Sequence, residues 1–168
     1  MAKNLLETIY ESYRQGLYSL ALSITGCQSS AEDAIHQAFS RMSSEVLSTK
    51  DDATAYVFRA VRNASIDSRR RQSRNQKFHE SIFNGYIPPS ESTFENPDTR
   101  VLTAERNQIL RKAIDELQES PRQAILLRTY SGLTFKQIGT VLGIPTKTAA
   151  TQYRRALSQL EQRLKGKI

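Results

Sequence analysis

One segment near the C-terminus, TFKQIGTVLGIPTKTAATQYRRAL at residues 134–157, restricts the fold more than any other part of the chain. Thr134 is placed to cap a helix with Gln137 as its capping-box partner, and Gly143 is placed to end that helix after a short apolar stripe. A tight connection containing proline follows, and we expect Thr146 to cap the next helix. Two helices at this spacing predict a helix-turn-helix.

The second helix of this motif has an apolar side and a basic side. Its apolar stripe comprises Ala149, Tyr153, Ala156, Leu157, Leu160 and Leu164. The opposite side carries hydroxyl, methyl and cationic groups, at Thr146, Lys147, Thr148, Ala150, Thr151, Arg154 and Arg155. No Asp or Glu occurs between Thr146 and Leu160, so this side suits the major groove of DNA better than it suits an ordinary solvated helix hairpin. The motif alone leaves repressor, activator and polymerase subunit open.

The charge of the whole chain favours a polyanionic partner. Its 168 residues include 24 Lys+Arg and 17 Asp+Glu, which give a formal net charge of +7. Alternating runs of β-branched residues are missing, so the predicted fold class is all-α. The single Cys27 excludes an internal disulfide, and the lack of a long apolar run excludes membrane insertion, so we expect a cytoplasmic protein. No metal-ligand spacing is present.

The N-terminal part of the sequence predicts three helices. An apolar stripe over residues 6–24 indicates the first. The second is expected over residues 29–47, with Ser29 and Glu32 as its capping box. Asp52 is placed to cap the third.

The third helix becomes strongly basic towards its C-terminal end. Between residues 59 and 74 there is one acid, Asp67, beside six arginines: Arg59, Arg62, Arg69, Arg70, Arg71 and Arg74. The helix dipole favours cations at such an end, but it does not require an excess of this size. The sequence therefore predicts a second basic surface, remote in sequence from the helix-turn-helix.

The segment between the two basic regions has the composition of a linker. Residues 75–95 lose the helical periodicity and contain the turn-forming pairs NG and PP. The helical pattern restarts at Asn96, with Val101 and Leu102 on the side expected to be buried. We therefore predict two small helical domains joined by a flexible linker: residues 1–74, the linker 75–95, and residues 96–168 with the helix-turn-helix.

Three blocks of the sequence, taken in order, resemble the extracytoplasmic-function group of bacterial sigma factors. They are SSAEDAIHQAFSRM at residues 29–42, AYVFRAVRNASIDSRRR at residues 55–71, and LQESPRQAILLRTYSGLTFKQIGTVLGIPTKTAATQYRRALSQL at residues 117–160. The resemblance covers nearly the whole chain. It implies a promoter-specificity subunit that joins core RNA polymerase and directs it to particular start sites. Such a subunit is not an enzyme and needs no cofactor, because the polymerase carries out the catalysis.

The resemblance also implies roles for residues at matching positions. The helix that binds the β′ clamp helices of polymerase in such factors contains Glu32, Asp33, Gln37 and Phe39 here. The part that reads and melts the minus-ten element contains Arg59, Arg62, Asn63, Asp67 and Arg70, and residues 48–52 match the segment that accepts a flipped-out base. The basic side of the second helix in the helix-turn-helix falls at the minus-thirty-five element. Core polymerase and promoter DNA are thus the implied partners, and an anti-sigma protein clamped between the two domains is a reasonable expectation.

The sequence departs from the family at two places. The chain has no tryptophan, although the family commonly has one after the clamp-helix phenylalanine and one near Tyr56, so any base stacking falls to Tyr56 or Phe58. Ala150 and Gln152 stand where the recognition helix usually offers Lys and Arg, which implies an unusual preference at the upstream element.

Two other classes of protein remain open from the sequence. A stand-alone helix-turn-helix regulator would bind its operator tightly without polymerase. An interaction protein that imitates a regulator's partner is the other class, although a mimic of DNA should be acidic and this chain carries +7. An enzyme is not indicated, because no Gly-rich phosphate loop, activated nucleophile or carboxylate pair stands out.

Overall fold

The computed structural model describes residues 4–75 and 97–167, which form helices joined by short turns. The N-terminal half comprises α1 (Leu5–Thr25), α2 (Gln28–Ser40), α3 (Ser44–Ser48) and α4 (Ala53–Asn75). The C-terminal half comprises α5 (Pro97–Asp115), α6 (Glu119–Ser131), α7 (Phe135–Leu142) and α8 (Thr146–Leu164). These residues contain no strand, which agrees with the all-α prediction. The predicted linker, apart from Asn75, and Asn96 lie outside the described residues.

Local capping groups determine where the N-terminal helices begin and end. The side chain of Asn4 accepts a hydrogen bond from the backbone N–H of Leu6 at 2.8 Å, and α1 ends at Gly26, whose φ of 76° favours glycine. The carboxylate of Asp52 accepts from the backbone N–H of Ala55 at 2.9 Å. The predicted cap of α4 is therefore confirmed.

The predicted second helix is wrong in its start and in its length. It begins at Gln28 after Cys27, so Ser29 lies inside the first turn and caps nothing. It ends at Ser40, and a separate short helix, α3, follows because the hydroxyl of Ser43 accepts from the backbone of the new turn and caps it.

The predicted cap of α8 is also wrong. Thr146 is the first residue of the helix, and Pro145 occupies the cap position with ψ of 151° and no capping side chain. Proline fits this position because its ring fixes φ near −65°, and Pro145 has φ of −60°.

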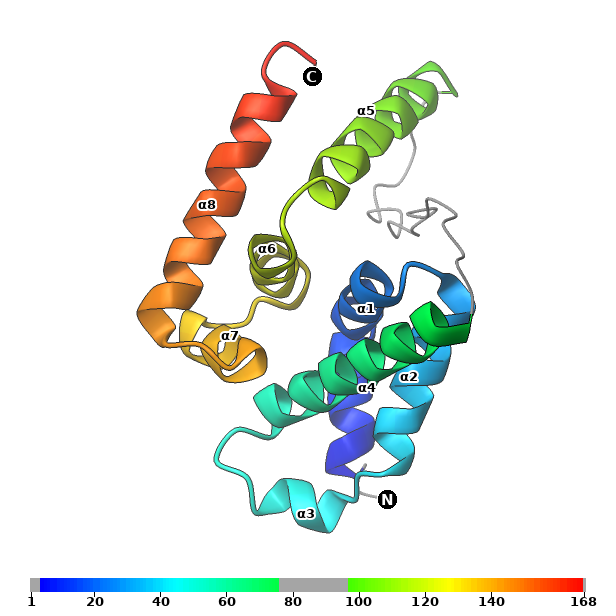
Figure 1. The fold of residues 1–168 in the computed structure, drawn as a ribbon, viewed down its shortest axis with the longest axis vertical. Coiled ribbons are helices and arrows are strands. Elements are labelled where there is room, and N and C mark those ends of the chain that lie inside the picture. Colours follow the sequence, from blue (N-terminus) through cyan, green and yellow to red (C-terminus); the bar gives the residue numbers. More distant parts are fainter. Residues whose placement is uncertain (1–3, 76–96, 168) are drawn as a thin grey trace.

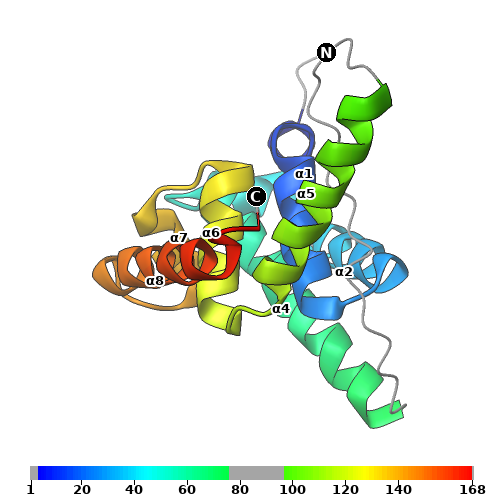
Figure 2. The same ribbon diagram turned by 90° about the horizontal axis from the view of Figure 1, so that it is seen from above.

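The two halves pack against each other. Helix α6 lies against α1 and α7 lies against α4, while α8 is on the outer side of the molecule (Figure 1, Figure 2). The largest core cluster crosses this boundary, because Leu127, Leu133 and Ile138 share it with Leu17 and Phe58. The sequence predicted two domains, but it did not predict this contact between them.

Three residues that the helical periodicity places in the core are exposed instead. The exposed fractions of Val101, Leu102 and Leu157 are 60%, 56% and 44%. In α5 the buried residues, such as Ala113 and Ile114, lie in the last turns. Periodicity identifies the apolar side of a helix, but only the packing decides how much of its length another element covers.

A pH dependence of stability is expected from Asp115, at the end of α5. Burial raises the pKa of this carboxyl from 3.8 to about 6, although Arg122 opposes the shift. The folded protein therefore holds this proton more tightly than the unfolded chain does. The free energy of unfolding falls as pH rises through the interval between these two pKa values. Asp115→Asn should remove this dependence and raise the free energy of unfolding near neutral pH by about 1 kcal/mol or less, since solvent screens a half-buried group. Urea unfolding on both sides of the interval measures it, and a variant less stable at neutral pH would contradict it.

Candidate nucleic-acid interface

Helices α7 and α8 form the predicted helix-turn-helix. The Thr134 hydroxyl accepts from the backbone of Gln137 at 3.1 Å, and the Gln137 side chain accepts from the backbone of Thr134 at 2.9 Å, so the predicted capping box is confirmed. Gly143 ends α7 with φ of 68°, as predicted. These contacts fix the turn between the helices and therefore the direction of α8.

Gly139 is essential to this turn, and the sequence analysis did not single it out. The backbone N–H of Ile144 donates to the carbonyl of Gly139 at 2.9 Å. A Cβ atom at position 139 would lie 2.7 Å from the carbonyl oxygen of Ile144, which is closer than real Cβ contacts. A glycine inside a short, strongly amphipathic helix was the signal that could have identified this close approach.

The basic side of α8 faces away from the core. Its apolar residues Ala149, Ala156 and Leu160 are buried. Of the outward residues predicted from the sequence, Thr148 and Ala150 are half-buried, and the exposed ones are Thr146, Lys147, Thr151, Arg154 and Arg155. The three cations of this row form no ion pair with any residue that the structure describes. Unpaired cations beside hydroxyl groups are suited to DNA phosphates and base edges.

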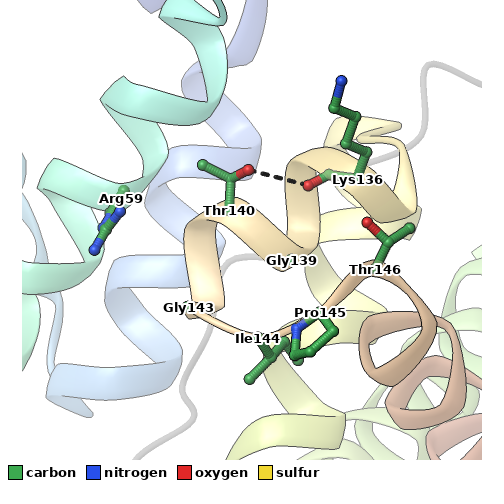
Figure 3. Close-up of a pocket in the computed structure, with 8 residues that line it drawn as sticks. All are labelled: Arg59, Lys136, Gly139, Thr140, Gly143, Ile144, Pro145 and Thr146. Atoms are coloured by element: carbon green, nitrogen blue, oxygen red, sulfur yellow. Dashed lines mark hydrogen bonds between the residues drawn. The ribbon is translucent and has the colours of Figure 1, made fainter.

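A groove of about 510 Å³ lies between the helix-turn-helix and α4 (Figure 3). It is lined by Arg59 from α4, and from the helix-turn-helix by Lys136, Gly139, Thr140, Gly143, Ile144, Pro145 and Thr146. The Thr140 hydroxyl donates to the backbone carbonyl of Lys136 at 3.2 Å. This hydrogen bond involves the backbone of Lys136 and not its ammonium group. Arg59 and Thr146, which the resemblance assigns to different promoter elements, therefore line the same groove.

The predicted DNA contacts of α4 fall into two groups with different surroundings. Asn63, Asp67 and Arg70 are exposed. Arg59 and Arg62 lie on the side that faces α6 and α7, where Arg59 is exposed at the groove and Arg62 is half-buried.

Arg62 belongs to a polar network that joins the two halves. Its Nε donates to the amide oxygen of Gln123 at 2.7 Å, and the Gln123 side chain donates to Glu119 at 3.0 Å. Glu119 also pairs with Arg69 at 3.3 Å. Gln123 is fully buried, and burial lowers the pKa of Arg62 although Glu119 opposes that shift. No local pattern in the sequence signals a contact between residues 61 positions apart.

The residues predicted to bind polymerase share α2 but differ in setting. Glu32 and Asp33 are exposed. The side chain of Gln37 is half-buried and accepts from Arg71 of α4 at 3.2 Å. Phe39 lies in a groove of about 370 Å³ between α1 and α2, which is also lined by Leu6, Glu7, Tyr10, Glu11, Ile35 and His36.

The two aromatic candidates for base stacking, Tyr56 and Phe58, differ in exposure. Phe58 is 0% exposed and packs edge-to-face on Tyr13, so its ring is not available to DNA. Tyr56 is half-buried beside the predicted base-accepting loop, and the ammonium group of Lys50 lies 4.8 Å from its ring centroid. The ammonium group of Lys50 therefore makes a cation–π contact with the ring of Tyr56.

Comparison with known protein families finds two matches in the chain. Residues 9–75 match Sigma-70 region 2, and residues 107–160 match Sigma-70, region 4. The first contains α2 and α4, and the second contains the helix-turn-helix. Among helices in the described ranges, none has the length and apolar character needed to cross a bilayer.

Curated proteins and solved structures show the same similarity over nearly the full length. The sigma factor SigV of Bacillus subtilis is 24% identical over 96% of this chain and 92% of its own, and SigL of Mycobacterium tuberculosis is 29% identical over 93% and 86%. The sigma factor RpoE of Bartonella quintana, solved with the anti-sigma factor NepR, superposes with a TM-score of 0.70 at 21% identity, covering 95% of this chain and 96% of its own. CnrH, solved with the cytosolic domain of CnrY, gives 0.60 at 18%, covering 95% and 87%.

Proposed function

This chain belongs to the sigma-70 family, in its extracytoplasmic-function group, and we propose that separate surfaces of it bind the two promoter elements and core polymerase. The chain is a promoter-specificity subunit of RNA polymerase. The observation that carries this conclusion is the order of the two matches, with region 2 on the half that contains the basic α4 and region 4 on the half that contains the helix-turn-helix. A stand-alone regulator is not favoured, since it needs no region 2.

In this proposal α8 binds the upstream, minus-thirty-five element. Its outward row supplies cations for the backbone phosphates and for acceptors on guanine, while the hydroxyl groups of Thr148 and Thr151 are suited to either kind of contact. Ala150 offers only a methyl group, which suits the methyl of thymine.

Helix α4 and the loop before it bind the downstream, minus-ten element. Arg59, Arg62 and Arg70 supply positive charge for a separated strand, and Tyr56 supplies the aromatic face on which an unpaired base stacks. Unstacking a base costs a few kcal/mol, which such contacts can offset. Asn63 and Asp67 are exposed on the same helix and supply polar contacts to base edges.

Helix α2 binds the β′ clamp helices of core polymerase. Glu32 and Asp33 provide an exposed acidic face, and Phe39, later in the same helix, provides an apolar anchor in the groove between α1 and α2. This combination of a charged rim and an aromatic anchor is typical of protein–protein interfaces. We further infer that an anti-sigma protein regulates the chain, because the similar RpoE structure is bound to the anti-sigma factor NepR. We also infer that the chain acts in the cytoplasm by binding alone, while polymerase catalyses.

Reconstituted transcription tests the function directly. Core RNA polymerase supplemented with the chain should produce specific run-off transcripts from genomic fragments of the source organism, and thymines of the downstream element should become reactive to permanganate. Core enzyme alone is the control. A chain that footprints DNA without polymerase and produces no transcript with it would be a stand-alone regulator.

A further inference from the structure

The outward side chains of α8 differ in length along the helix. Long cationic side chains lie at Lys147, Arg154 and Arg155, which are exposed and form no ion pair with a described residue. Two short side chains lie between them, the half-buried Ala150 and the exposed Thr151. Residues three and four apart on a helix share a side, with Cβ atoms about 5–6 Å from one another. The outward side of α8 therefore has a short, methyl-bearing centre with cations before and after it.

The hydroxyl group of Thr151 is used inside the helix. It donates to the backbone carbonyl of Lys147, one turn earlier, at 3.0 Å. This bond satisfies the hydroxyl hydrogen, as is common for threonine within a helix. Thr151 is exposed, so it offers a ligand its methyl group and an oxygen atom that can only accept.

The neighbouring Gln152 does not supply a base-reading amide. Its Oε1 atom is buried and has no hydrogen-bond partner among the described residues. A glutamine that reads adenine contacts the base edge with both its oxygen and its nitrogen, and an Oε1 enclosed by protein is turned away from such an edge. The outward residues of α8 predicted from the sequence include no Asn, Gln, Asp or Glu. The side chains that most specifically read adenine and cytosine are therefore missing from this surface.

Methyl groups and cations recognise different parts of DNA. In the major groove only thymine carries a methyl group, at C5, and the methyl groups of alanine and threonine make apolar contact with it. Lysine and arginine donate instead to O6 and N7 of guanine or to the phosphates. A surface with methyl groups at its centre and cations around them is therefore complementary to a thymine flanked by guanines or phosphates.

We propose that Thr151, with Ala150 beside it, selects thymine in the upstream promoter element, and that it does so with its methyl group and not with its hydroxyl group. Both side chains are short, so they allow the backbone of α8 to approach the base edges closely. The cations before and after them hold the DNA backbone in place. This inference rests on the proposed function, because it specifies which base the α8 surface recognises.

A single methyl contact has a small but measurable effect on affinity. Burying one methyl-sized group contributes about 0.8 kcal/mol, which corresponds to about a fourfold change in the dissociation constant. Deoxyuridine differs from thymidine only in lacking the C5 methyl group and keeps every hydrogen-bonding atom of the base. Replacing the selected thymine by uracil should therefore weaken binding by about fourfold.

The first part of the experiment locates this thymine. Promoter duplexes in which each thymine of the upstream element is replaced in turn by deoxyuridine compete with the unmodified duplex for RNA polymerase that carries the chain. At least one replacement within the element should weaken binding by about fourfold. Replacement of thymines upstream of the element is the control and should leave the affinity unchanged.

The second part uses two variants that separate the methyl group of Thr151 from its hydroxyl group. Thr151→Val keeps a methyl group and removes the hydroxyl, whereas Thr151→Ser keeps the hydroxyl and removes the methyl. Polymerase that carries Thr151→Val should still prefer thymine to uracil at the located position by about fourfold, and polymerase that carries Thr151→Ser should bind both duplexes equally. The preference is a ratio measured on one variant, so a general loss of affinity or stability cancels.

Three results would overturn the inference or the function beneath it. If no uracil in the element weakens binding, the methyl contact does not exist. If Thr151→Ser keeps the preference for thymine and Thr151→Val loses it, the hydroxyl group reads the base and the inference is wrong. If polymerase with the wild-type chain neither binds nor transcribes an unmodified promoter, the proposed function fails instead.

Discussion

Reversing the charges of Glu32 and Asp33 to lysine should abolish association with core RNA polymerase while the melting curve stays unchanged. Both side chains are exposed on α2, and surface substitutions usually change the free energy of unfolding by less than about 0.5 kcal/mol. Like charges brought together at a protein interface cost several kcal/mol of binding free energy. A pull-down with core enzyme and a run-off assay should therefore both fail.

The matched control for this experiment carries the same change in charge elsewhere. Glu105 and Glu161 are exposed on α5 and α8, so their double reversal to lysine alters the net charge equally without touching α2. We expect this control to retain core binding. If the α2 variant is captured by core enzyme as efficiently as the wild-type chain, the clamp-binding role of α2 is wrong.

Lys147→Ala and Arg154→Ala should each weaken promoter binding by the polymerase that carries this subunit. Both side chains are exposed on the outward row of α8 and form no ion pair with a described residue, so their removal should leave the fold intact. Loss of a base-edge contact costs about 1–3 kcal/mol and relaxes sequence preference, whereas loss of a phosphate contact weakens binding to all sequences alike and lowers the salt dependence. Gel-shift titrations on the matching promoter and on mismatched promoters, at two salt concentrations, distinguish these cases.

Lys165→Ala is the control for this series. Lys165 is an exposed cation directly after the end of α8, distant along the helix from the outward row, and its loss removes the same charge. Wild-type affinity in both α8 variants would show that the outward row is not the DNA surface.

Local sequence patterns were sufficient to predict the helix-turn-helix. The helix-turn-helix follows from Thr134, Gln137 and Gly143, whose capping contacts the structure confirms, because capping depends on residues within one turn of one another. The family followed from three ordered blocks, which the matches to regions 2 and 4 confirm. Where local rules were wrong, the cap lies two residues before the expected Ser29 in α2 and one residue before the expected Thr146 in α8.

Residue patterns were enough to predict that this protein is helical, that it carries a helix-turn-helix, and which sides of its helices are basic. That its two halves pack against each other is known only from the arrangement of the helices in space. The Arg62–Gln123 contact joins residues 61 positions apart, and Gly16 of α1 lies close to Ser131 of α6. Periodicity and capping extend over a few residues and contain no information on such distances, so the partners of Arg62 became visible only when the helices were placed in space.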